Sequence, residues 1–253
     1  MKNVGQEGDV SRNASEFLWR LATMKRFCRT LCVVFLLCAA ARAYTPTEGY
    51  SVRTIEGWKV RVNAELLDEH PELAERTLRL LEFQLYQITR VVRDEALKQL
   101  RQIPIWVEYE APRHPCMCYH PSKDWLGENG FNPEKAGSVE VANARNFLTW
   151  TIGQPWMVLH ELAHGYHHKV VGHDNAALKA LYEKAKAGGQ YESVLHISGR
   201  NRRAYALNND KEYFAECTEA FFGTNDFYPF VKSELKQHDA EMYQLLEKLW
   251  RVK

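Results

Sequence analysis

The stretch from His160 to His164 carries residue types and a spacing that suit metal chemistry, because it reads His-Glu-Leu-Ala-His. On an α-helix, residues four apart lie on one face, so His160 and His164 can direct two imidazoles at one metal ion. Glu161 lies about 100° further around the helix, beside the metal, where a general base for a metal-bound water belongs. The apolar residues 156–159 before it favour a helix buried beneath an active site.

A catalytic zinc site needs a third protein ligand and an open fourth position. The longer pattern H-E-x-x-H-x-x-G-x-x-H would need Gly at 167 and His at 170, where this sequence has His167 and Val170, so that class is excluded. Cys116 and Cys118 lack the E-G-C-L-type context of a deformylase-like site. The remaining source is a glutamate on a helix further along the chain.

Such a helix is predicted from about residue 210 to 222. Asn209 or Asp210 caps its start, and Gly223 ends it. Within it Glu212 and Glu216 are four residues apart and therefore lie on one face. The sequence thus offers a carboxylate to complete the ligand set.

The two segments together resemble the gluzincin metallopeptidases typified by the catalytic domain of anthrax lethal factor. In that family H-E-x-x-H is followed, at about the same interval, by Y-x6-E-(F/Y)-F-A-E, which matches Tyr205 to Glu216 here. The resemblance implies Glu212 as the third zinc ligand, and Tyr205 as the hydroxyl that stabilises the oxyanion. It implies Glu216 as an acceptor that holds a ligand imidazole. His196 is the alternative oxyanion donor, since other gluzincins use a downstream histidine.

The resemblance also implies an α+β, zincin-like fold with one catalytic Zn²⁺, and an endopeptidase that acts on a peptide or protein. Glu161 would take the proton of the attacking water and pass it to the leaving amine. The matching region covers about residues 155–222, so the substrate of the family does not carry over. Two alternatives stay open: a non-catalytic zincin-fold binding protein with a structural zinc, and an aminopeptidase or amidase with the same metal chemistry.

Residues 24–43 have the organisation of a secretory signal peptide. Three basic residues precede the apolar run 31–40, and an Ala-Arg-Ala cleavage site ends at Ala43. We therefore expect a secreted or periplasmic protein without a stable membrane anchor after cleavage. Residues 1–23 are interpreted as an over-called upstream extension, and residues 44–253 as a single catalytic domain.

The formal net charge of +1 gives no indication of nucleic-acid or anionic-membrane binding, and we expect a monomer. In an oxidising compartment Cys217 is expected to pair with Cys116 or Cys118. His114 and His120 flank these two cysteines, but a C-x-C spacing is weak evidence for a small metal site.

The remaining pattern predicts a small sheet followed by helices. Strands are expected at 57–63, 103–109 and 136–143. The family resemblance implies that the strand at 136–143 is an edge that pairs with an extended substrate. A loop is expected from 112 to 137. Helices are expected at 71–100 and at about 155–170, 174–187, 210–222 and 238–251.

Overall fold

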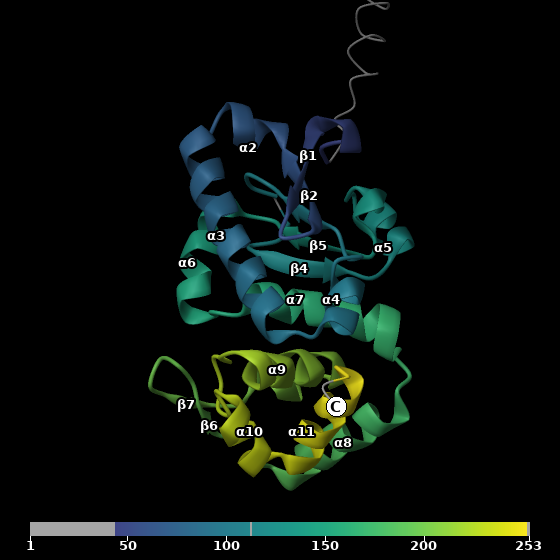
Figure 1. Cartoon of the computed structure of the whole chain (residues 1–253), viewed down its shortest axis with the longest axis vertical. Coiled ribbons are helices and arrows are strands. Elements are labelled where there is room, and N and C mark those ends of the chain that lie inside the picture. Colours follow the sequence, from purple (N-terminus) through teal and green to yellow (C-terminus); the bar gives the residue numbers. More distant parts are fainter. Residues whose placement is uncertain (1–43, 112, 252–253) are drawn as a thin grey trace, which may run out of the picture. The chain divides into compact units, whose positions relative to one another are not determined.

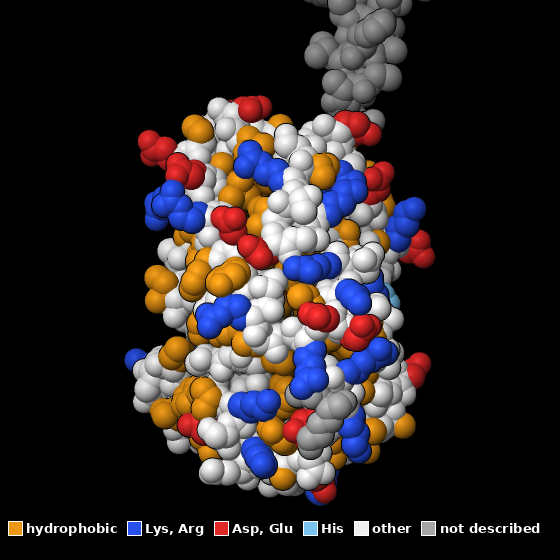
Figure 2. Space-filling view, viewed as in Figure 1, with side chains coloured by type: hydrophobic (Ala, Val, Ile, Leu, Met, Phe, Trp, Pro, Cys, Tyr) orange, Lys and Arg blue, Asp and Glu red, His pale blue; other side chains and the backbone are white. Residues whose placement is uncertain are grey.

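The computed structural model describes residues 44–111 and 113–251, and the expected segments 1–23 and 24–43 lie outside them. The described chain is an α+β protein, as the sequence predicted, and its main sheet is mixed and has five strands (Figure 1). On the face shown in Figure 2, basic and acidic side chains are interspersed, in keeping with the small net charge. Within the described ranges, no helix is both long enough and apolar enough to cross a membrane.

The sheet has the strand order β1-β2-β3-β5-β4. β1 and β2 form an antiparallel hairpin whose turn places Glu56 and Gly57 at positive φ, 49° and 89°. β2, β3 and β5 run parallel, whereas β4 pairs antiparallel with β5 and forms one edge. The strands are β1 (Tyr50–Ile55), β2 (Trp58–Asn63), β3 (Ile105–Val107), β4 (Met117–His120) and β5 (Ser138–Val141).

The edge strand differs from the one expected. The stretch 136–143 does contain a strand, β5, but it lies between β3 and β4, so both of its sides are already paired. All four of its residues are buried, as in the interior of a covered sheet. The edge is β4, which forms inside the stretch 112–137 that was wrongly expected to be a loop. Its sequence, Met-Cys-Tyr-His, has no β-branched residue to indicate a strand.

The helix that carries the H-E-x-x-H residues, α7 (Met157–Tyr166), lies between the sheet and the C-terminal helices (Figure 1). It contacts β4 and β5 on one side and α9 (Asp210–Phe222) on the other. Val158, Leu159 and Leu162 are fully buried. Apolar contact on both sides therefore fixes the position and rotation of α7.

The helix expected over 71–100 is divided. It breaks at Val92 and Arg93, which adopt extended backbone conformations, so the single helix expected there is wrong. The helix expected over 238–251 is present as α11 (Ala240–Leu249), and the carboxylate of Asp239 caps its start. The helices α6 (Ala144–Gly153) and α10 (Lys232–His238) were not expected.

The described α-helices other than α7 and α9 are α2 (Ala64–Asp68), α3 (Pro71–Val91), α4 (Asp94–Leu100), α5 (Lys123–Glu128), α6 (Ala144–Gly153), α8 (Ala176–Gly188), α10 (Lys232–His238) and α11 (Ala240–Leu249). The short elements are η1 (Thr47–Gly49), η2 (Pro133–Lys135), the π-helix η3 (His167–Val171), β6 (Val194–Leu195), β7 (Asn201–Arg202) and η4 (Tyr205–Leu207).

Aromatic stacking joins the last helix to the two helices of the site. The rings of Tyr166 in α7 and Trp250, just after α11, are stacked with centroids 4.1 Å apart. The ring of Phe214 in α9 also stacks with the ring of Trp250, with centroids 5.9 Å apart. The Tyr166 hydroxyl also donates a 2.9 Å hydrogen bond to the carbonyl oxygen of Leu249. Through Trp250 and Leu249, these contacts join α7 and α9 to the C-terminal end of the chain.

The expected disulfide does not form, because Cys116, Cys118 and Cys217 are all free thiols. Cys217 is buried in α9, with its sulfur 3.8 Å from the Tyr191 hydroxyl. The sulfur of Cys116 instead lies 3.6 Å from the sulfur of Met157, at the start of α7. Their side chains pack against different neighbours, so that expectation is wrong.

We predict that Gly165→Ala destabilises the protein, because α7 passes close to the residues beneath it. A Cβ at Gly165 would lie 2.6 Å from Cδ1 of Ile103 and 3.1 Å from the ring of Tyr119. Overpacking of this kind costs about 1–3 kcal/mol. Urea unfolding followed by circular dichroism measures the change.

Gly188→Ala, at the end of α8, is the matched control, since an added Cβ there meets nothing within 4 Å. Its stability should stay the same or rise by up to ~1 kcal/mol through helix propensity. A Gly165→Ala protein as stable as the control would contradict the packing described for α7.

Candidate metal centre

A cavity of about 430 Å³ lies where α7, α9 and β4 meet. The lining includes His160, Glu161 and His164 from α7 together with Glu212 from α9. Tyr205, at the start of η4, also faces it. The structure therefore brings all five of these predicted residues to one place, although the two segments that carry them are far apart in the sequence.

Three potential metal donors form a compact triangle in this cavity. The Nε2 atoms of His160 and His164 are 3.1 Å apart. Oε2 of Glu212 lies 3.1 Å from Nε2 of His160 and 3.2 Å from Nε2 of His164. All three side chains are partly buried, and their donor atoms converge on a single point.

Hydrogen bonds can hold this triangle when its atoms share protons. Burial lowers the pKa of His160, but hydrogen bonds with Glu212 and Glu219 raise it well above its ordinary value. Nδ1 of His160 donates a 2.7 Å hydrogen bond to Oε1 of Glu219, so the neutral form of this imidazole, which is the form that binds a metal ion, would present the lone pair of Nε2. That lone pair faces a second imidazole nitrogen and a carboxylate oxygen, which are also electron-rich. A cation held by all three offsets their mutual repulsion, and two nitrogens with one carboxylate form a common ligand set for a transition-metal ion.

Glu212 is positioned by the first turn of α9. The side chain of Asn209 accepts hydrogen bonds from the backbone N–H groups of Lys211 and Glu212, at 2.9 and 3.0 Å. This is the helix N-cap predicted from the sequence, and Gly223 follows the last helical residue as expected. The cap fixes the backbone of Glu212 directly.

Glu219, which the sequence reasoning missed, holds the ligand imidazole more closely than Glu216 does. Nδ1 of His160 is 2.7 Å from Oε1 of Glu219 but 3.7 Å from Oε1 of Glu216. Glu216 instead accepts a 3.2 Å hydrogen bond from the side chain of Asn225. Helical spacing could have found Glu219, because positions 212, 216 and 219 share one face of α9.

The charge on this face of α9 is concentrated at Glu212. Burial opposes its ionisation, but hydrogen bonds with His160 and His164 lower the pKa of its carboxyl below the usual range. Burial, together with the nearby charge of Glu219, raises the pKa of Glu216 well above its ordinary value. Burial also raises the pKa of Glu219, so Glu212 is the carboxyl group on this face that ionises most readily.

Tyr205 and Glu161 are the two other reactive groups of the cavity. The Tyr205 ring centroid lies 6.5 Å from that of His160, and 47 % of the residue is exposed. Partial burial and then the charge of Glu212 raise the pKa of the Tyr205 hydroxyl, so it keeps its proton at neutral pH and can donate it. Glu161 extends from α7 into the same cavity.

The ring of His196 packs against Phe227, which lines the cavity, with ring centroids 4.6 Å apart. Its backbone forms an isolated bridge with Phe227, and its ring contacts Ser198 Oγ at 2.8 Å and Asp226 Oδ2 at 3.5 Å. His196 itself is not among the described residues that line the cavity. Its ring is thus engaged in local contacts, and Tyr205 is the better-placed hydrogen-bond donor.

Comparison with family models, curated proteins and solved structures finds no match to this chain. The function of the site is therefore inferred from the geometry of its own residues.

We predict that Glu219→Ala weakens metal binding more than Glu216→Ala does. Loss of an acceptor that orients a ligand imidazole typically lowers metal affinity about 10–100-fold. Titration calorimetry of metal-free protein with Zn²⁺ measures both variants. A larger loss in Glu216→Ala would contradict the assignment of Glu219 as the acceptor for His160.

Proposed function

We propose that this protein is a secreted zinc-dependent endopeptidase of gluzincin type, with a zincin-like fold. The observation that supports it best is the triangle formed by His160, His164 and Glu212, with donor atoms 3.1–3.2 Å apart. Atoms bound tetrahedrally to zinc at 2.0–2.2 Å are ~3.3 Å from one another, so the three donors are already spaced for that ion. Export is inferred from residues 24–43 of the sequence.

Bound zinc would act as a Lewis acid that lowers the pKa of a water molecule and polarises a peptide carbonyl. The protein's own groups then manage the protons. Glu161, one residue from His160 and in the same cavity, accepts the proton of the attacking water and returns it to the leaving amine. Tyr205, still protonated at neutral pH, donates a hydrogen bond to the developing oxyanion.

Strand β4 is suited to hold the substrate. It is an edge of the sheet and contributes Met117, Cys118 and Tyr119 to the cavity wall. An extended peptide can therefore pair with its free backbone groups, the role that resemblance gave to the stretch 136–143. Trp150 and Met157 add apolar surface to the same cavity, which favours an apolar side chain near the bond that is cut.

The arrangement favours catalysis over a purely structural metal. A structural zinc site normally has four protein ligands. The described residues offer a group of three at this point, and its open side faces the cavity. An aminopeptidase or amidase would use the same metal chemistry, and the cleavage positions found in a peptide library separate these possibilities from an endopeptidase.

We predict that Glu161→Gln abolishes hydrolysis without loss of metal. Glutamine keeps the size of the side chain but cannot accept the proton of the water, and loss of such a base typically costs about 10²–10⁴ in rate. The measurement is cleavage of a diverse peptide library, read by mass spectrometry, alongside zinc content by elemental analysis.

Glu82→Gln, at an exposed position of α3, is the matched control and should keep full activity. A wild-type chain that binds zinc but cleaves no peptide in the library would reject the endopeptidase proposal. Full activity in Glu161→Gln would reject the role of Glu161 alone.

A further inference from the structure

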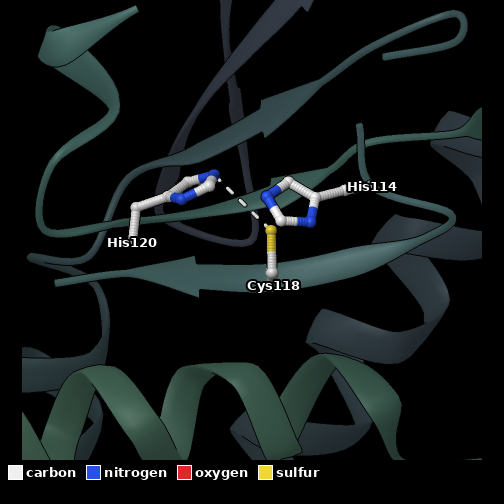
Figure 3. A group of neighbouring side chains, drawn as sticks. All are labelled: His114, Cys118 and His120. Carbon is white, nitrogen blue, oxygen red and sulfur yellow. Dashed lines mark hydrogen bonds between the residues drawn. The ribbon is translucent and has the colours of Figure 1, made fainter. Parts of the chain in front are cut away.

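A second cluster of potential metal ligands lies on the other face of β4. Side chains alternate along a strand, so Cys118 and His120 share a face opposite to Tyr119. Tyr119 points toward the helices, where its hydroxyl is 2.8 Å from Nδ1 of His168 and its ring lies beside Gly165 of α7. Cys118 and His120 therefore project away from α7, where His114 from the preceding segment joins them (Figure 3).

The three side chains converge as ligands do. One donor atom from each of His114, Cys118 and His120 lies within 4.8 Å of the other two. The sulfur of Cys118 is 3.5 Å from Nε2 of His120. Figure 3 shows the two rings flanking this sulfur, with a nitrogen of each directed toward the space between them.

One of these donors is buried without a partner. Nε2 of His114 is shielded from solvent and makes no hydrogen bond in the described structure. An unsatisfied buried polar atom costs about 1–3 kcal/mol, so it calls for an explanation. Burial and the neighbouring His120 lower the pKa of His114, which keeps the ring neutral and a lone pair available.

A cavity of about 480 Å³ adjoins the cluster and gives an ion access to it. Its wall combines the three potential ligands with the apolar side chains of Trp125 and Leu126. This cavity is separate from the one at His160, although Cys118 contributes to the wall of both.

We propose that His114, Cys118 and His120 form a second metal site, which takes Zn²⁺ or a similarly thiophilic cation. The inference is independent of the proposed peptidase activity. Thiolate and imidazole ligands favour such ions over Mg²⁺ and Ca²⁺, which prefer oxygen. Two histidines and one cysteine leave a fourth position open toward the adjoining cavity.

Metal binding at this site releases one proton and moves another within an imidazole ring. Burial raises the pKa of the Cys118 thiol, so without metal the cysteine is protonated, and coordination releases that proton to solvent. Nε2 of His120 now shares a 2.5 Å hydrogen bond with Oε2 of Glu140, and the ion competes for this nitrogen. The imidazole proton then resides on Nδ1.

The carboxylate of Glu140 keeps a charged partner after His120 has turned to the metal. Burial opposes its ionisation, but the bond with His120 and the charge of Lys135 hold the pKa of its carboxyl at about 2. The ion pair with Lys135 persists when His120 turns to the metal.

Cobalt substitution tests the second site with a signal that the first cannot produce. The full chain, kept reduced, is titrated with Co²⁺, and the near-ultraviolet sulfur-to-cobalt charge-transfer band is recorded. The donors His160, His164 and Glu212 include no sulfur, so a band reports thiolate coordination. Wild-type protein should show the band, and so should His160→Ala, which disables the first site.

Cys118→Ser should lose the band, whereas Cys116→Ser, two residues away, should keep it. His114→Ala should weaken or shift it. Circular dichroism of each variant establishes that it is folded. Absence of the band in the wild-type chain, or its survival in folded Cys118→Ser, would overturn the proposed site.

Discussion

The contact between α7 and α9 is the constraint on which the rest of the structure depends. Two imidazoles from one helix meet the carboxylate of Glu212 from the other, and a third residue of α9, Glu219, holds the far side of His160. Placing several carboxyl groups against partly buried histidines is costly unless their charge is shared. Hydrogen bonds between Glu212 and the two histidines meet part of that requirement, and a cation held among the three donors would meet the rest.

The surrounding fold keeps this contact in register. The sheet presses on α7 through β4 and β5, while the stacked rings of Tyr166, Trp250 and Phe214 join α7 to the C-terminal helices. The close approach at Gly165 lets the helix lie directly against Ile103. A small displacement of either helix would separate the three donor atoms, so the packing of the core sets the geometry of the site.

Local sequence signals predicted the parts of the site that depend on local physics. The four-residue spacing of His160 and His164, the Asn209 cap and the glycine after α9 are all present as expected. Each follows from helical periodicity or from backbone hydrogen bonding at a helix end. The α+β class follows in the same way, from the order of strand-like and helical patterns.

What escaped prediction depends on distant contacts. The sequence of β4 has no strand signal, and its place at the edge results from pairing with β5, about twenty residues away. Glu219 shares a helical face with Glu212 and Glu216, but only the packing of α7 against α9 makes it, in place of Glu216, the near partner of His160. The cysteines were expected to pair, but Cys217 packs against Tyr191, a tertiary contact that the sequence does not indicate. The sequence places His114 and His120 on either side of Cys118, but the convergence of their donor atoms depends on the path of the chain before β4.

The central claim is that His160, His164 and Glu212 hold one metal ion. Anomalous X-ray diffraction at the zinc edge, on crystals grown from zinc-loaded protein, tests it most directly. We predict a strong peak ~2.0–2.2 Å from Nε2 of both histidines and from a carboxylate oxygen of Glu212. A zinc-loaded crystal with no peak among these three side chains would contradict it.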